Sequence, residues 1–404
     1  MKKHQIDAQE VLLADLCYPD QIGQYGIPAA GEPYTKDKNR YLRITDISDD
    51  GLLLDVDKKG VSGEIDERYF LSEGDVVFAR TGNSTGRSYL YDKKDGRLVY
   101  AGFLIKYKLD PAKVNPRYIH YFTQSAYYKA WVKNLSVGST RGNISATTFA
   151  ECPIYLPDRT RQDRLVDVLS AIDRKIALNR KRIATLEAMA KEIYDYWFVQ
   201  FDFPDAHGRP YKSSGGAMVY NPDLKREIPK GWEVVRIGDV LDRHILSTNK
   251  IPAKAYGQFG AYPIIDQSEK FIAGYTDDKN AILDYPFCTV FGDHSCELKA
   301  VNFPFARGAD GTQIVVSADA NVPNVQLYFA LRMMDFGGGY KRHFVLAKDS
   351  LIVKDAIGVA APRFEKVEKA IFDGIKHCRF ENFKLTGLRD FLLPVLMNGQ
   401  VKVR

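Results

Sequence analysis

A heptad pattern of apolar residues runs through a long segment in the middle of the chain. Apolar positions recur at alternating steps of four and three, and the resulting seam consists of Ile172, Ile176, Asn179, Ile183, Leu186, Ala190, Ile193 and Trp197. This spacing is typical of a helix that packs along one stripe against another helix. Neither Gly nor Pro interrupts the segment between Thr160 and Val199. The pattern therefore predicts one helix of about 40 residues, roughly 60 Å long.

The same pattern returns near the C-terminus. Ala370, Ile371 and Ile375 stand opposite Ala171, Ile172 and Ile176, and the second seam consists of Ile371, Ile375, Cys378, Asn382, Leu385, Arg389, Leu392 and Leu396. This helix is expected to start near Pro362, because proline suits a first helical turn. Gly374, Gly387 and Pro394 all weaken a helix, so we expect it to be shorter or bent. The repeat predicts two similar halves whose long helices pack against each other.

Two seam positions hold asparagine, Asn179 and Asn382. An Asn that is buried in a coiled coil lowers its stability but fixes register and partner choice. Alternatively, both side chains lie at the edge of the seam and contact water. The sequence leaves both possibilities open.

Short strand-like stretches fill the segments that precede the two helices. Residues 41–47, 76–79 and 103–107 are short apolar stretches that contain Tyr or Phe and predict strands, whereas Pro116 to Trp131 predicts a helix. Gly, Pro and Ser residues accumulate after Phe203 and predict a linker. We predict an α+β fold with a pseudo-two-fold repeat, in which two strand-rich domains are separated by two long helices packed as an antiparallel coiled coil. The expected boundaries are 1–155 and 231–355 for the domains, 156–200 and 356–404 for the helices, and 201–230 for the linker.

Composition narrows the class of protein. The chain has 404 residues, enough for two cores, and its 45% hydrophobic and 27% charged residues are typical of globular domains. The N-terminal apolar stretch, Val11 to Leu13, is too short for a signal peptide or a membrane span, so we expect a cytoplasmic location and no membrane partner. The 5 cysteines show no CxxC spacing, which argues against a zinc site. A net charge of +6 is compatible with a nucleic-acid partner.

Several motifs, in order along nearly the whole chain, resemble those of the specificity subunit of type I restriction-modification systems. They comprise residues 41–47, residues 74–82, the loop 137–143, Leu156-Pro157 followed by Gln162, residues 172–176, residues 193–198 and residues 228–232. The second half departs from this pattern, because it lacks the Leu-Pro and Gln entry to its helix. Asp293-His294-Ser295 also replaces the turn Arg80-Thr81-Gly82.

The resemblance implies two target-recognition domains that each read one half of a bipartite site on double-stranded DNA. It implies that the helices set the spacer and dock two modification (methyltransferase) subunits, and that restriction subunits, which are ATP-dependent endonucleases and translocases, join the complex. No nucleotide-binding motif occurs in this chain. We therefore expect no catalysis and no cofactor here, with S-adenosylmethionine, ATP and Mg bound by the partner subunits.

Candidate DNA contacts lie in Gly-rich loops, where short polar side chains and the backbone can approach bases and phosphates. In the first domain they are Arg80, Thr81, Asn83, Ser84, Arg87, Arg141 and Asn143. In the second domain they are His294, Lys299, Arg307, Gln313, Lys341 and Arg342. A polar hairpin turn without any DNA contact would have the same composition. The candidate helix-packing and subunit-docking residues are the seam residues Ile172, Ile176, Asn179, Ile183, Leu186, Ile193, Trp197, Ile371, Ile375, Asn382, Leu385 and Leu392.

Two other classes of protein remain as alternatives. Asp284, Glu297 and Lys299 follow the residue order of many Mg-dependent nucleases, in which two carboxylates hold the metal and a lysine orients water. This short pattern arises often by chance. The third hypothesis is a coiled-coil scaffold whose globular domains bind other proteins, and it predicts no salt-dependent DNA affinity.

Overall fold

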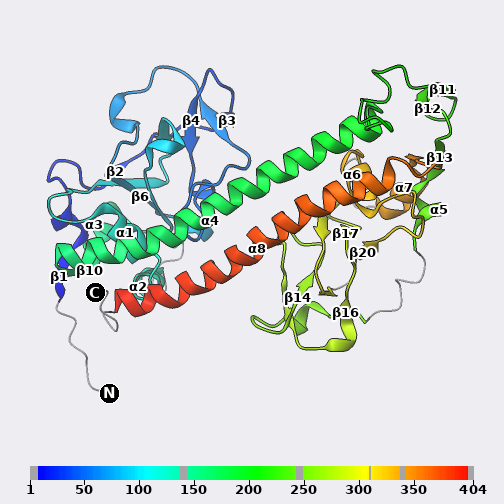
Figure 1. The fold of residues 1–404 in the computed structure, drawn as a ribbon. Coiled ribbons are helices and arrows are strands. Elements are labelled where there is room, and N and C mark those ends of the chain that lie inside the picture. Colours follow the sequence, from blue (N-terminus) through cyan, green and yellow to red (C-terminus); the bar gives the residue numbers. More distant parts are fainter. Residues whose placement is uncertain (1–7, 137–142, 243–248, 309–310, 337–342, 399–404) are drawn as a thin grey trace. The chain divides into compact units, whose positions relative to one another are not determined.

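The computed structural model describes residues 8–136, 143–242, 249–308, 311–336 and 343–398. The chain divides into two compact units (Figure 1). Unit 1 consists of Met1–Ile176 and Phe383–Arg404, and unit 2 consists of Ala177–Asn382. Each long helix therefore contributes one part to each unit.

The described part of unit 1 contains two small four-stranded sheets and one strand pair. The sheets have the orders β2-β9-β6-β7 and β3-β5-β4-β8, and β1 pairs antiparallel with β10. The strands are β1 (Ala8–Leu12), β2 (Gln24–Tyr25), β3 (Glu32–Pro33), β4 (Asn39–Leu42), β5 (Lys59–Val61), β6 (Asp75–Ala79), β7 (Ser88–Leu90), β8 (Leu98–Tyr100), β9 (Leu104–Lys108) and β10 (Pro153–Pro157). All five residues of β6 are buried, as expected for a central strand with both faces covered.

The helix expected at Pro116 to Trp131 is two helices. α1 (Pro116–Phe122) and α2 (Ala126–Ser136) are separated at Thr123, whose hydroxyl donates to the His120 carbonyl and accepts from the Ser88 hydroxyl. A third helix, α3 (Ala146–Ala150), follows. Short hydroxyl side chains offer the backbone such local alternatives to a continuous helix, and the apolar pattern did not reveal this break.

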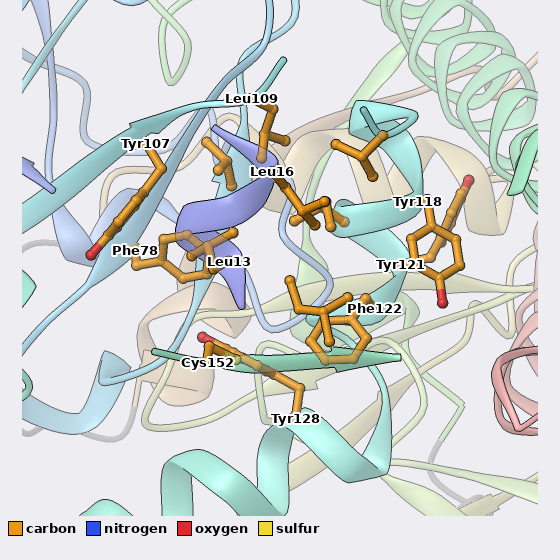
Figure 2. Close-up of a cluster of buried hydrophobic side chains, with 14 of the residues drawn as sticks. Leu13, Leu16, Phe78, Tyr107, Leu109, Tyr118, Tyr121, Phe122, Tyr128 and Cys152 are labelled. Atoms are coloured by element: carbon orange, nitrogen blue, oxygen red, sulfur yellow. The ribbon is translucent and has the colours of Figure 1, made fainter. Parts of the chain in front are cut away.

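The main core of unit 1 lies between β6, β9, α1, α2 and the 3-10 turn that follows β1. Figure 2 shows Leu13 and Leu16 of this turn beside Phe78 and close to the aromatic side chains of α1. The rings of Phe78 and Phe149 stack at 5.1 Å between centroids, and Phe78 meets Tyr107 edge to face at 5.6 Å. Aromatic side chains of β6, β9 and α3 thus contribute to this core.

Unit 2 repeats much of this plan. β13 pairs with β21 as β1 pairs with β10, and two sheets have the orders β15-β14-β19-β16 and β18-β17-β20. The strands are β11 (Met218–Asn221), β12 (Arg226–Pro229), β13 (Glu233–Arg236), β14 (Tyr262–Ile265), β15 (Gly274–Thr276), β16 (Ile282–Leu283), β17 (Cys288–Gly292), β18 (Leu298–Val301), β19 (Phe305–Arg307), β20 (Thr312–Val315) and β21 (Leu351–Lys354). The short helices are α5 (Ile237–Val240), α6 (Asn324–Arg332) and α7 (His343–Asp349). β11 and β12 form a hairpin within the segment expected to be a linker.

The two long helices are α4 (Arg159–Tyr194), which continues as a π-helical turn through Val199, and α8 (Ala361–Met397). The second helix was expected to be shorter or bent. α8 has 37 residues, against 36 in α4 and five more in its π-helical continuation, so Gly374, Gly387 and Pro394 do not end it early. Gly374 lies where α8 meets α4, and a Cβ there would be 3.3 Å from Leu186 Cδ1. Packing against α4 thus offsets the low helix propensity of glycine, as tertiary context commonly does.

Within each unit the two helices are antiparallel. In unit 2, Asn179 of α4 donates to Asn382 Oδ1 (2.9 Å) and Glu381 Oε2 (2.7 Å) of α8, and Arg379 pairs with Glu187 at 2.8 Å. Asn179 is only 2% exposed, so of the two open readings the buried one holds for this residue, while Asn382 is half-buried. In unit 1, Arg389 of α8 lies 3.4 Å from Asp173 of α4.

The seam residues lie on the inward sides of these helices. Six of the twelve are buried and the others half-buried: Ile172, Ile176, Asn179, Trp197, Ile371 and Ile375 are buried, and Ile183, Leu186, Ile193, Asn382, Leu385 and Leu392 are half-buried. Ile183, Leu186, Ile193, Trp197, Ile371 and Ile375 belong to one core cluster of unit 2. The heptad positions therefore mark the packed stripe of both helices.

Candidate nucleic-acid interface

A tight turn follows β6 in unit 1. Two backbone hydrogen bonds of 2.8 Å join the two ends of this turn. The Ala79 N–H donates to the Arg87 carbonyl, and the Gly86 N–H donates to the Ala79 carbonyl. Gly86 has φ +85°, and a Cβ there would lie 2.6 Å from Val132 of α2. Tyr128 of α2 also donates its hydroxyl to the Gly86 carbonyl. Only glycine satisfies both the backbone conformation and this close approach, so α2 holds the turn rigidly.

Arg80 leaves β6 at the start of this turn and is half-buried. Its guanidinium carbon lies 5.0 Å from the ring centroid of Tyr25, and its Nε donates to Asn143 Oδ1 at 3.2 Å. The Arg80 N–H donates to the Phe103 carbonyl and the Arg80 carbonyl accepts from the Ile144 N–H. Two of the predicted DNA-binding residues, Arg80 and Asn143, are thus brought together from segments far apart in the sequence.

The structure adds two aromatic residues that sequence reasoning missed. The Tyr25 ring lies beside the Arg80 guanidinium and is 42% exposed, and Phe103, whose carbonyl accepts from the Arg80 N–H, is 60% exposed. The Tyr25 hydroxyl accepts from the Ala146 N–H at 3.1 Å, which fixes the ring at the start of α3. Exposed aromatic rings beside a cation are suited to stacking on bases. No motif marked them, because Tyr25 ends β2 and Phe103 lies in the turn before β9, and the sequence pattern alone does not separate them from core residues.

Other predicted DNA contacts in this turn have contacts within the protein. Arg87 pairs with Asp49 at 2.7 Å and donates to the Ile47 carbonyl, and Ser84 is buried. Thr81 is half-buried and Asn83 is exposed. Arg87 therefore ties the turn to the segment 47–49, while Asn83 is accessible to a ligand.

A cavity of about 500 Å³ opens between this turn and α2. Asn83, Arg87, Lys129 and Lys133 contribute to its lining, and both lysines are exposed. Residues four apart lie on one face of a helix. Two lysines at this spacing beside a glycine turn suit contacts to a phosphate backbone, and the spacing was the signal that could have found them.

The equivalent position in unit 2 holds Asp293. The His343 N–H donates to the Asp293 carbonyl, as the Ile144 N–H does to the Arg80 carbonyl in unit 1. Asp293 is buried, and its Oδ1 accepts from the Phe344 N–H at 2.9 Å in the first turn of α7. The position that presents a cation in unit 1 therefore stabilises a helix start in unit 2.

The remaining candidates of unit 2 differ in accessibility. Lys299 is buried, and its Nζ donates to the carbonyls of Asp266 (2.8 Å) and Lys270 (2.5 Å). Arg307 is buried and donates from Nε and Nη2 to the Thr312 carbonyl. Burial lowers the pKa of both side chains, since it disfavours their charged forms. This geometry favours structural roles for them, whereas His294 and Gln313 are half-buried near the loop ends.

Three of the proposed DNA contacts, Arg141, Lys341 and Arg342, lie outside the described residues. The nuclease hypothesis gains no support from the described part of unit 2. Asp284 is exposed, the ammonium of Lys299 is engaged by two carbonyls, and the described residues contain no group of three His, Cys, Asp or Glu side chains placed to hold a metal ion. No described helix is long and apolar enough to cross a membrane.

The chain forms two strand-rich units, and each unit contains part of both long helices. In unit 1 a rigid turn presents cationic and aromatic side chains. These features are those of a candidate nucleic-acid-binding protein. Residues 7–188 match the family described as type I restriction modification DNA specificity domain. The putative type I restriction enzyme MjaX specificity subunit of Methanocaldococcus jannaschii is 23% identical over 91% of this chain and 89% of its own length. The MjaIX specificity subunit of the same organism is 35% identical, over 31% of this chain and 27% of its own length.

The fold also has a relative among solved structures. The type I restriction-modification system S subunit from M. genitalium has a TM-score of 0.58 at 15% identity, covering 97% of this chain and 96% of that one. At this identity the likeness concerns the fold. The sequence matches, and not this likeness, connect the chain with type I restriction-modification specificity subunits: residues 7–188 match the family model, and the MjaX subunit is similar over nearly the whole chain.

Proposed function

We propose that this chain gives a type I restriction-modification complex its DNA sequence specificity, each strand-rich domain reading one half of a bipartite site on double-stranded DNA. The family match and the near full-length relative support this function. The observation that carries the two-site arrangement is the repeated framework. The Leu13 N–H donates to the Cys152 carbonyl, and the Ile237 N–H donates to the Ser350 carbonyl, at equivalent places beside β1–β10 and β13–β21.

We further propose that the chain recognises DNA without catalysis and that two modification subunits dock on α4 and α8. Large apolar side chains on the outer sides of the helices support this docking. Leu178 of α4 and Phe391 of α8 are 60% and 66% exposed, and neither belongs to the seam. S-adenosylmethionine, ATP and Mg would then belong to the modification and restriction subunits, and the complex would act in the cytoplasm. Exposed apolar residues of this kind are typical of surfaces that bind another protein.

The test is to co-express the chain with a cognate modification subunit in a methylation-free host and to map methylated bases across the genome. An interrupted two-part motif is the expected result. Co-purification of the two proteins without any methylation would contradict the specificity role. Catalytically inactive modification subunit is the control for background methylation.

The helices set the spacer between the half-sites in this proposal. Insertion of about four residues, close to one helical turn, after Leu186 should lengthen the spacer of the methylated motif. Both half-sites should keep their sequence, because neither recognition turn is touched. An unchanged spacer in a stable, co-purifying variant would exclude the helix as the element that sets the distance.

A further inference from the structure

Arg80 differs from the other arginines of its domain in how its charge is balanced. In the described part of the first recognition domain, every other arginine forms an ion pair with a carboxylate; these are Arg40, Arg43, Arg68, Arg87, Arg97 and Arg117. Arg80 has instead a neutral partner, the amide oxygen of Asn143, and an aromatic ring beneath it. Its positive charge is therefore left available to a ligand.

The contacts of Arg80 also fix which of its donors remain. Its Nε is used by Asn143 Oδ1, and among the described residues neither Nη atom has a hydrogen-bond partner. The guanidinium has five N–H donors in a planar fork. With Nε engaged, the two Nη groups present one straight edge, which matches two acceptors lying side by side in a plane.

Rigidity distinguishes a base reader from a phosphate contact. The side chain is half-buried, it is stacked over Tyr25, and the backbone on both sides is bonded to Phe103 and Ile144. A guanidinium held in this way has lost most of its rotational freedom before binding, which favours planar, bidentate recognition over attraction to a mobile charge. In the major groove guanine offers this pair of acceptors, O6 and N7.

We propose that Arg80 reads a guanine in the half-site of the first domain through its two Nη groups, with Tyr25 and Asn143 acting as positioning residues that hold the guanidinium plane. This inference rests on the proposed DNA-specificity function and adds the base and the residue that reads it. Arg87, although it is in the same turn, is excluded from this role because Asp49 and the Ile47 carbonyl occupy its guanidinium.

Methylation maps of the co-expressed complex give the first test. The wild-type motif should contain a guanine in one half-site. The Arg80→Ala complex should accept other bases at that position, and its second half-site should be unchanged. Arg68→Ala is the matched control, since Arg68 is exposed in the same domain and pairs with Asp66; it should leave the motif as it is. If Arg80→Ala lowers methylation equally at all sites without changing the motif, Arg80 contacts phosphate or is structural, and the inference is wrong.

Binding measurements that combine protein variants with modified DNA test which guanine atoms Arg80 contacts. Duplexes carrying 7-deazaguanine at the mapped position lack the N7 acceptor, and they should bind the wild-type complex roughly tenfold more weakly, within the range of one lost bidentate contact. The Arg80→Ala complex should bind both duplexes equally. An undiminished penalty in Arg80→Ala would show that another residue reads this guanine. Absence of any motif in the wild-type map would instead count against the proposed function itself.

The positioning residues have a separate readout. Tyr25→Phe keeps the ring and should keep the guanine preference, whereas Tyr25→Leu removes the platform and should reduce that preference without changing the second half-site. Thermal unfolding of both variants controls for loss of the Ala146 contact. Equal loss of preference in the two variants would mean that the hydroxyl, and not the ring, positions Arg80.

Discussion

Arg80 in unit 1 and Asp293 in unit 2 occupy the same place in the repeat but have opposite charges and different partners. Both follow a buried central strand, and both accept a backbone hydrogen bond from the segment that enters a short helix. Arg80 extends a cation over Tyr25, while Asp293 is buried and bonds the first turn of α7. The repeat thus preserves the backbone framework, and the side chain at one position decides whether the turn presents a cation or stabilises a helix start.

A second pair of equivalent positions differs in the same way. Leu169 of α4 and Glu368 of α8 are both fully buried, at 0% exposure. Leu169 belongs to the core of unit 1. Both carboxylate oxygens of Glu368 lack a hydrogen-bond partner among the described residues, and burial raises the pKa of this carboxyl from 4.5 to about 8. Unit 2 thus contains a destabilising group where unit 1 has a leucine.

The largest effect is expected from Glu368→Leu. Below pH 4.5 the carboxyl is protonated in both the folded and the unfolded state; between pH 4.5 and 8 the unfolded chain loses this proton first, so the stability of unit 2 falls as pH rises. The substitution should raise the free energy of unfolding by about 5 kcal/mol above pH 8 and remove this pH dependence. Denaturant unfolding between pH 5 and 8.5 measures it.

Glu365→Leu is the matched control, since Glu365 is exposed three residues away on the same helix. It should change stability by less than about 0.5 kcal/mol at any pH in this range. A Glu368→Leu variant that is no more stable than the wild type at pH 8.5 would mean that Glu368 has a polar partner in solution.

The turn of unit 1 should be sensitive to its glycine. Gly86→Ala combines a φ of +85° with a 2.6 Å approach to Val132, and it should lower the free energy of unfolding by about 3 kcal/mol. Gly96→Ala tests the backbone alone, because Gly96 has φ +76° and nothing within 4 Å of an added Cβ, and it should cost only about 1 kcal/mol. Equal losses in the two variants would show that α2 does not pack tightly on the turn.

The next largest effect on stability is expected from Asp293, which stabilises the start of α7. Asp293→Ala removes the acceptor of the Phe344 N–H at a buried site and should cost about 2 kcal/mol. Asp293→Asn keeps an acceptor oxygen and should recover more than half of that loss. Hydrogen exchange at the Phe344 amide would locate the change. If both substitutions are neutral, the contrast between Arg80 and Asp293 has no energetic basis.

The smallest effect concerns the turn of unit 2. Cys296 has φ +57°, a conformation that favours glycine, whereas the unit 1 turn already has glycine at its strained positions. Cys296→Gly should therefore raise the free energy of unfolding by about 1 kcal/mol. The greater chain entropy that glycine gives to the unfolded state offsets a small part of this gain. Cys296→Ser, which keeps the strained backbone, is the control and should show no such gain in thermal unfolding.

The sequence by itself determined the architecture. Heptad spacing marked the stripes of α4 and α8, and the recurrence of that stripe marked the two halves, because a side chain's burial on a helix depends chiefly on its position in the period. It did not determine the length of α8, where contact with α4 offsets the cost of Gly374, nor the break at Thr123, which depends on hydrogen bonds to Ser88 and His120.

For the candidate site, the sequence suggested which residues could bind a ligand, and the tertiary structure decided which of them are accessible. The glycine-rich turns put forward Arg80 and Asn143 as candidates, and a loop region without a sharp motif put forward Lys299 and Arg307, which are buried and bonded to carbonyls. Tyr25, Phe103 and Asn143 meet Arg80 only because distant strands and loops converge on the end of β6. Local pattern fixes which residues can form an element, whereas the accessibility of a charge and its partners depends on packing between segments far apart in the chain.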